Sequence, residues 1–256
     1  MKLNVQALCR KGPIRENNED MVSVGGILLR DSETEISFDT DTDRCHFFVA
    51  DGMGGHDKGE EASSFLLETL RDCFSLGDFD ESLPEMLQST VECIGAKLNA
   101  RAVHEGQSRP MGTTLTGVVF LKDKVWMVNS GDSRTYRFHD GLITQLSTDE
   151  VGRMGGLTGC IGGGMESKPV IEDITDRVEE DDILLICSDG LSGAVWEDEL
   201  EYFLVTSANP AEELYDRALL NGTTDNVSII LVRIGDKDFG DDGDFQDDDG
   251  RFDAWA

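Results

Sequence analysis

Carboxylates at the ends of apolar segments are the first feature of this sequence that could do chemistry. A single aspartate in this position is usually a turn or cap residue. A buried carboxylate is costly, however, unless it is paired or binds a metal ion. The sequence holds five such acidic sites, each beside glycine or a small polar residue: Glu19-Asp20 in RENNED, Asp51 in VADGMGG, Asp132 in NSGDSR, Asp189 in LLICSDGLSG and Asp225 in GTTDNVSII.

These carboxylates would repel one another if the fold brought them together. At close range the repulsion amounts to several kcal/mol per pair, even at an effective dielectric constant of about 20. Divalent cations remove that penalty. Oxygen ligands without a histidine or cysteine cluster favour Mg²⁺ or Mn²⁺ over Zn²⁺. The acidic sites therefore predict a carboxylate-rich metal centre.

The composition limits the classes of protein that carry such a centre. The chain has 256 residues, a hydrophobic fraction of 39% and a formal charge of -30 from 22 basic and 52 acidic residues. This length and apolar content allow one large globular domain or two small ones. The acidity argues against nucleic acid or an anionic membrane as a partner.

The sequence also predicts the cellular location of the protein and the redox state of its cysteines. The first residues, MKLNVQALCRKG, lack the apolar core of a signal peptide, and no apolar stretch is long enough to span a membrane. No CxxC pair occurs among the cysteines, so buried free thiols in a reducing compartment are expected. We predict a cytoplasmic protein. The six cysteines are Cys9, Cys45, Cys73, Cys93, Cys160 and Cys187.

Strand-like segments cluster first, helical segments follow, and strand-like segments then recur. Runs rich in β-branched and aromatic residues predict strands at 3–9, 21–29, 45–50, 114–121, 124–131, 134–138, 182–188 and 227–234. Apolar periodicity predicts helices at 59–74, 83–103, 196–207 and 209–222. The order lacks regular βαβ alternation, which favours antiparallel sheets with helices packed outside them.

Local signals refine two of these segments. Lys122 and Asp123 separate two strand-like runs and predict a hairpin. In the last helix, Asn209 can cap the start, Pro210 fits the first turn, and Gly222 follows the end.

The last 22 residues differ in kind from the rest. From Gly235 onward the chain holds nine Asp, one Lys and one Arg, a net charge of -7. Such a segment buries too little apolar area to offset its ordering entropy, and it contains no match to a calcium-binding loop. The sequence therefore predicts a catalytic domain at 1–234 and an acidic, disordered tail at 235–256.

Six motifs together resemble one family. RENNED, DGMGGH, MGTTL, GDSRTY, CSDGLSG and TDNVSIILV follow one another between Arg15 and Val232. In this order they are similar to the metal-dependent protein phosphatase 2C family, in its bacterial style. The resemblance implies an α+β fold, in which two antiparallel β-sheets form a sandwich flanked by helix pairs, a four-layer αββα arrangement. It implies hydrolysis of phosphoserine and phosphothreonine by a metal-activated water.

The resemblance also implies a binuclear Mn²⁺ or Mg²⁺ centre. Asp51 would bridge the two ions, the carbonyl of Gly52 would bind one of them, and Asp189 and Asp225 would complete the first. Glu19 and Asp20 would hold waters of the second, directly or through hydrogen-bonded neighbours. Asp132, with Asp189, would serve a third ion, as in bacterial members.

Arg15 and His56 would act on the substrate. Arg15 would hold the substrate phosphate in a bidentate clamp; the alternative is a surface salt bridge. His56 would protonate the leaving oxygen, or would only order the glycine turn. We expect structural roles for Thr113 and Asn226, and expect Arg134 to be the buried partner of a carboxylate.

The sequence departs from the family pattern at one place. Only VGRMGG (151–156) stands where the family usually carries a flap of some tens of residues. We predict that the flap is reduced to a turn or missing. The missing flap leaves the substrate selectivity and the third metal site undetermined. It does not affect the predicted ligands of the binuclear centre.

Two other functions compete with this one. Cys9 and Arg15 match the C-x5-R spacing of cysteine phosphatases, although the segment between them lacks a glycine-rich amide cradle. A pseudophosphatase that serves as a phosphoprotein-binding scaffold is the second alternative, although every expected carboxylate is present. The expected partners are phosphorylated proteins, substrates of a serine/threonine kinase, and the expected state is a monomer that binds neither nucleic acid nor membrane.

Overall fold

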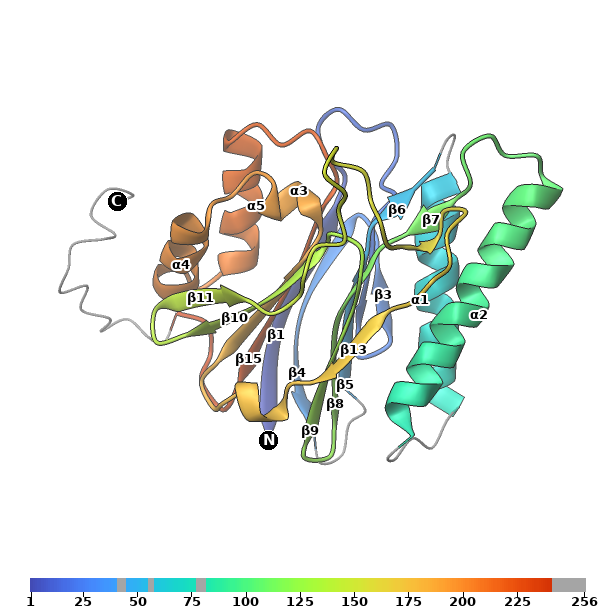
Figure 1. Ribbon diagram of the computed structural model, residues 1–256. Coiled ribbons are helices and arrows are strands. Elements are labelled where there is room, and N and C mark those ends of the chain that lie inside the picture. The colour runs from blue at the N-terminus through green and yellow to red at the C-terminus, as the bar shows by residue number, and fades with distance from the viewer. Residues whose placement is uncertain (41–44, 55–57, 77–81, 241–256) are drawn as a thin grey trace.

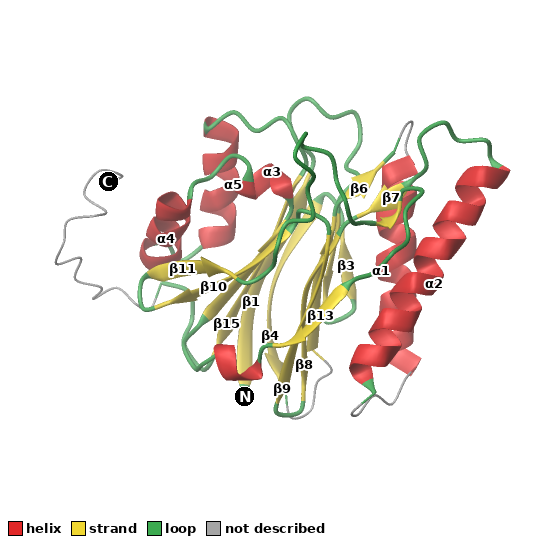
Figure 2. Ribbon diagram, in the orientation of Figure 1, coloured by secondary structure: helices red, strands yellow, loops and turns green. Residues whose placement is uncertain are grey.

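Two six-stranded antiparallel sheets face each other and carry helices on their outer faces (Figures 1 and 2). The computed structural model describes residues 1–40, 45–54, 58–76 and 82–240. The predicted α+β sandwich with helices outside is confirmed.

The first sheet contains both ends of the described chain. In it β1 pairs with β15 in antiparallel register from Leu3–Ile234 to Arg10–Val227, and β4 forms one edge. Its strand order is β11 (Leu142–Gln145), β10 (Arg134–His139), β14 (Ile183–Cys187), β15 (Val227–Ile234), β1 (Lys2–Arg10) and β4 (Ser32–Asp39).

The second sheet contains the predicted hairpin. Strands β8 and β9 are joined at Leu121 and Lys124, with Lys122 in the left-handed region at φ 57°. The strand order is β13 (Val170–Asp173), β9 (Lys124–Ser130), β8 (Leu115–Leu121), β5 (Cys45–Ala50), β2 (Met21–Val24) and β3 (Ile27–Leu29). A small third sheet joins β12 (Ile161–Gly162), β7 (Gly112–Thr113) and β6 (Gly52–Met53).

The four predicted helices form close to their expected bounds. Helices α1 (Lys58–Leu76) and α2 (Leu83–His104) cover the second sheet, and α4 (Glu197–Thr206) and α5 (Pro210–Leu220) cover the first. Two short elements were not expected: α3 (Asp189–Ser192) and the 3-10 turn η1 (Thr175–Arg177). Asn209 stands at the N-cap of α5 but makes no side-chain capping bond, contrary to prediction, while Pro210 lies in the first turn as expected.

Burial on both faces explains why the central strands read as continuous apolar runs. In β15, Ile230 and Val232 point into the core between the sheets, whereas Ile229 and Leu231 pack under the helices. The opposite outer face buries residues such as Phe48 of β5 against Leu66 and Leu70 of α1. Period-two alternation inside an apolar run thus places one side chain in each of two cores.

The strand predictions merged two strands into one and missed the strands β4, β6, β7, β11, β12 and β13. The run 21–29 is a hairpin rather than one strand, because Gly25 and Gly26 adopt φ of 56° and 92° and turn the chain between β2 and β3. Edge strand β4 was missed, since its sequence SETEISFD is largely polar. Only its Ile36 and Phe38 pack against the core between the sheets.

The described part of the predicted tail lies against the body. Phe239 is buried in the core beneath α4 and α5, and Lys237 pairs with Asp181 at 2.7 Å. Residues 241–256 lie outside the described residues, so the disorder predicted for them stays a prediction. All six cysteines are free; Cys93 is exposed and Cys73 half-buried, while the other four are buried as expected. No helix in the described ranges is long and apolar enough to cross a membrane.

Candidate active site

A cavity of about 230 Å³ opens at one end of the sandwich. Strand pairing brings its parts together: β14 ends where β15 begins, and β5 ends beside the start of β2. The residues that line it include most of the predicted site and come from distant parts of the chain: Arg15, Glu19, Asp51, Gly52, Met53, Gly54, Thr114, Asp132, Leu157, Asp189 and Asp225.

Asp51 is held at the end of β5 by the backbone around it. Its N–H donates to Thr114 Oγ1 at 3.0 Å, and its carbonyl accepts from the N–H of Thr114 at 2.8 Å and from Thr113 Oγ1 at 3.0 Å. These bonds account for the MGTTL motif, because both threonines fix the main chain of Asp51 and leave its carboxylate free to face the cavity. The structural role expected for Thr113 is what this geometry shows.

Glycine is required next to Asp51 because backbone segments cross there. A Cβ at Gly52 would lie 2.2 Å from the carbonyl oxygen of Gly59 and 2.5 Å from that of Glu19. The N–H of Gly52 donates to the same Glu19 carbonyl at 3.2 Å. Gly52 therefore lets the loop of Glu19 and the start of α1 approach the end of β5.

Asn226 ties the two ends of the chain together at the site. Its Oδ1 accepts from the N–H of Glu19 at 2.9 Å, and its Nδ2 donates to the carbonyl of Asn17 at 3.2 Å. The amide side chain thus positions the RENNED loop against the segment that carries Asp225, which agrees with the structural role predicted for it.

Asp20 does not line the cavity but lies beside it in the interior. It is 1% exposed and accepts a hydrogen bond from Ser228 Oγ at 2.8 Å. Arg30 fixes its main chain, because Nε donates to the Asp20 carbonyl at 2.9 Å while Nη2 donates to Ser63 Oγ at 2.8 Å. Of the predicted pair, Glu19 lines the cavity, whereas Asp20 is buried next to it and hydrogen-bonds to Ser228.

Arg15 reaches across the cavity mouth to Asp225. Its guanidinium Nη2 forms an ion pair and hydrogen bond with Asp225 Oδ2, and the arginine side chain is 46% exposed. Arg15 thus forms a salt bridge, as the alternative prediction expected, but its partner Asp225 is a predicted metal ligand rather than a remote surface acid.

The buried carboxylates raise one another's pKa. Burial raises the pKa of Asp51 well above its usual range, and the charges of Asp20 and Asp189 raise it further. Burial raises the pKa of Asp20 to about 7, against the lowering effect of hydrogen bonds from Ser188 and Ser228. The pKa of Asp189 is raised by burial and then by Asp225, and that of Asp132 by burial and then by Asp189. Clustered carboxylates with mutually raised pKa values in one cavity are typical of a functional site.

The donor set fits a hard divalent cation. The cavity is lined by carboxylate oxygens, and Asp189 Oδ1 is buried without a hydrogen-bond partner among the described residues. As they stand, no three His, Cys, Asp or Glu side chains in the described ranges form a group that could hold an ion. Asp225 faces Arg15, and the carboxylates surround the cavity rather than converge on one point.

The reduced flap is confirmed as a short turn. A bridge pairs Val151 with Leu157, and the N–H of Gly152 donates to the carbonyl of Gly156 at 2.7 Å. Leu157 lines the cavity, a contact that sequence reasoning missed because no periodicity marks a turn residue. The tip is exposed, with Met154 fully accessible.

Arg134 has the predicted carboxylate partner, although it is half-buried rather than buried. Its Nε and Nη2 donate to the two oxygens of Asp149 at 3.0 and 2.7 Å. The pair anchors β10 to the segment that leads into the 151–157 turn.

The cysteine-phosphatase alternative is wrong. Cys9 is fully buried, and burial, together with the charge of Asp20, raises the pKa of its thiol to about 12. A thiol in this state is not a nucleophile, and Arg15 points at Asp225 instead. His56, the other predicted catalytic residue, lies outside the described residues.

Comparisons with known proteins agree with this geometry. A family model described as protein phosphatase 2C matches residues 24–221. The chain is 31% identical over 266 aligned positions to the serine/threonine protein phosphatase PstP of Mycobacterium tuberculosis, with 93% of this chain and 46% of that protein covered. It therefore spans about half the length of that relative. Against the serine/threonine phosphatase stp of Listeria innocua it is 29% identical, covering 87% of this chain and 92% of that protein.

A solved structure shares the fold over its whole length. The catalytic domain of PstP in complex with two manganese ions superimposes with a TM-score of 0.73 at 28% identity, covering 92% of this chain and all of that one.

Proposed function

The chain belongs to the protein phosphatase 2C family, and on that premise we propose that it hydrolyses phosphoserine and phosphothreonine in proteins. Water would replace the serine or threonine oxygen at phosphorus, and inorganic phosphate and the free hydroxyl would be the products. One observation carries the proposal: five carboxylates and one arginine from five separate segments line a single cavity at the end of the sandwich.

The carboxylates would hold two Mn²⁺ or Mg²⁺ ions. Asp51, Asp189 and Asp225, with the carbonyl of Gly52, are the proposed ligands, and Glu19 and Asp20 would orient waters near the second ion. Asp132 faces the same cavity and, with Asp189, would serve a third ion. When bound, such ions lower the pKa of a coordinated water and stabilise the charge that develops at phosphorus.

Arg15 supplies the positive group that the chain itself contributes at the cavity mouth. Two of its guanidinium N–H groups can donate to two oxygens of a phosphate, a match that lysine cannot reproduce. Its half-exposed position lets an incoming phosphate reach it. We infer that Arg15 exchanges Asp225 for the substrate phosphate. His56 remains proposed as the donor of a proton to the leaving oxygen.

Substrate and location follow from the same features. The proposed substrates are phosphoproteins made by a serine/threonine kinase, and the short 151–157 turn leaves the cavity mouth open to a protein surface. The free cysteines support a reducing, cytoplasmic location. We expect a monomer, since the exposed large apolar side chains come from many different elements; size-exclusion chromatography with light scattering tests this.

The decisive assay measures phosphate release from a phosphothreonine peptide with Mn²⁺, with and without a chelator. We expect activity that needs the metal and returns when Mn²⁺ is added back. Cys9→Ala should retain that activity, since the thiol is buried away from the cavity. Turnover that survives chelation, or that disappears in a folded Cys9→Ala variant, would overturn the proposal. A folded protein that binds the phosphopeptide without turnover would favour the pseudophosphatase.

A further inference from the structure

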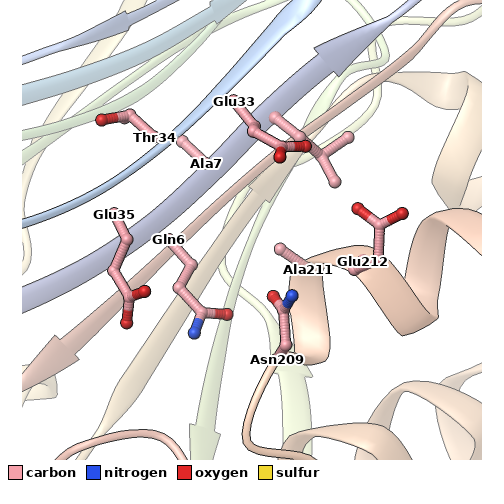
Figure 3. A pocket seen from close by; sticks show the side chains of 9 residues that line it. Gln6, Ala7, Glu33, Thr34, Glu35, Asn209, Ala211 and Glu212 are labelled. Atoms are coloured by element: carbon pink, nitrogen blue, oxygen red, sulfur yellow. The ribbon is translucent and has the colours of Figure 1, made fainter.

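We propose that a second cavity binds a guanidinium or primary ammonium group. This cavity has a volume of about 290 Å³ and shares no lining residue with the candidate active site. It lies on the outer face of the first sheet, between strands β1 and β4 and the start of α5 (Figure 3). The proposal concerns binding alone and does not depend on phosphatase activity.

A buried acceptor without a donor faces this cavity. Gln6 is only 5% exposed, and its Nε2 donates to the carbonyl of Ala208 at 3.0 Å. That bond fixes the orientation of the amide, because only its NH₂ end can donate. Oε1 is then buried with no hydrogen-bond partner in the described part of the chain, and Figure 3 shows it turned toward Asn209 and Ala211. Buried acceptors in folded proteins are nearly always paired, so this oxygen calls for a donor.

The charges around the cavity select a cation as the donor. Glu33, Glu35 and Glu212 line it, and among the described residues the guanidinium of Arg10 contacts both Glu33 and Glu212. Three carboxylates against one guanidinium leave two net negative charges. The N–H groups at the start of α5 would favour an anion, but a helix N-terminus is equivalent to only about half a positive charge, less than the net negative charge of the carboxylates and Arg10.

Arg10 shows what these carboxylates accept. Its Nη1 donates to Glu212 Oε1 at 2.8 Å, and its guanidinium lies 4.8 Å from the ring centre of Tyr215. The site thus already binds one planar cation. The carboxylate of Glu35 has no partner among the described residues and remains available for a second. The volume far exceeds that of a bare metal ion and suits a small organic cation.

The cation could be a free amine or a basic side chain of a peptide, and both present the same chemistry. Isothermal titration at about 20 mM and about 150 mM salt, which spans a large change in screening length, would use agmatine and spermidine as free probes. A Gly-Arg-Gly peptide with an acetylated N-terminus and an amidated C-terminus, which carries no terminal charges, serves as the probe for a basic side chain. Tighter binding of the free amines identifies a small molecule; tighter binding of the peptide identifies a partner chain.

The variants separate a built site from general attraction to an acidic protein. Glu35→Gln and Gln6→Met should each weaken binding about tenfold, whereas Glu68→Gln, an equal charge change on exposed α1, should leave it unchanged. All three should keep the melting temperature of the unaltered chain within a few degrees. The proposal is overturned if no probe gives saturable one-to-one binding, or if Glu68→Gln weakens binding as much as Glu35→Gln. Unaltered affinity in a folded Gln6→Met would also overturn it.

Discussion

Replacing Arg15 by alanine tests how the candidate site recognises phosphate. In the structure its guanidinium bridges to Asp225 at the cavity mouth and is half exposed. The substitution removes the positive side chain that lines the cavity and leaves Asp225 without its ion-pair partner. If Arg15 clamps the substrate, the loss should fall on substrate binding and not on metal binding.

The magnitude follows from the bonds that would be lost. A charge-assisted hydrogen bond contributes about 1.5–3 kcal/mol, so kcat/KM should fall by about 10- to 150-fold, chiefly through KM. The ion pair with Asp225 is partly exposed, and such pairs contribute roughly 0–1 kcal/mol to stability. Unfolding free energy should therefore change by less than about 1 kcal/mol. The Mn²⁺ concentration for half-maximal activity should stay the same or fall, because Asp225 loses a competing cation.

The assay measures kcat and KM for a phosphothreonine peptide across a series of Mn²⁺ concentrations. Arg153→Ala is the matched control, since Arg153 is an exposed arginine on the 151–157 turn and the charge change is identical. Arg15→Lys should recover part of the lost kcat/KM, because lysine restores the positive charge but not the paired N–H donors of the guanidinium. An unchanged KM in Arg15→Ala, or an equal rise in Arg153→Ala, would refute the clamp and leave Arg15 as a structural partner of Asp225.

Three further predictions follow from the same structure. Asp51→Asn and Asp189→Asn should each reduce turnover by orders of magnitude, and near-normal turnover would refute the ligand assignment. In the presence of chelator each variant should keep or raise the melting temperature, because it removes a carboxylate whose burial among like charges raises its pKa. His46 is buried against Phe74, and burial lowers its pKa to about 4 from 6.5, so its contribution is fully present above pH 6.5 and is lost as the pH falls toward 4. Relative to His46→Phe, the unaltered chain should lose about 2 kcal/mol of unfolding free energy between pH 7 and pH 5, and parallel urea curves for the two at both pH values would contradict this. Removing residues 241–256, a cut that spares buried Phe239, should leave kcat/KM within about twofold, less than about 0.5 kcal/mol in the barrier; a several-fold gain at low salt that disappears at high salt would instead reveal an autoinhibitory tail.

Local patterns in the sequence predicted the main elements of the fold. The four main helices and the central strands carry their own periodicity, so α1, α2, α4 and α5 formed where apolar residues recur at helical spacing. The carboxylates of the cavity were also identifiable, because they lie at the ends of apolar segments, where a charged residue is costly to bury. Prediction failed where the local signal was weak or misleading. Polar β4 is a strand only because it pairs with β1, and Gly25-Gly26 split an apolar run that resembled one strand.

Tertiary structure alone decided which of these residues meet. Arg15 and Asp225 are 210 positions apart in the sequence, yet they form an ion pair. Glu19 lines the cavity, whereas its neighbour Asp20 is buried and accepts a hydrogen bond from Ser228, 208 positions away. Leu157 lines the cavity, and Gln6 presents an unpaired oxygen to the second cavity. Contacts of this kind depend on strand register and helix packing over the whole chain, which no short stretch of sequence specifies.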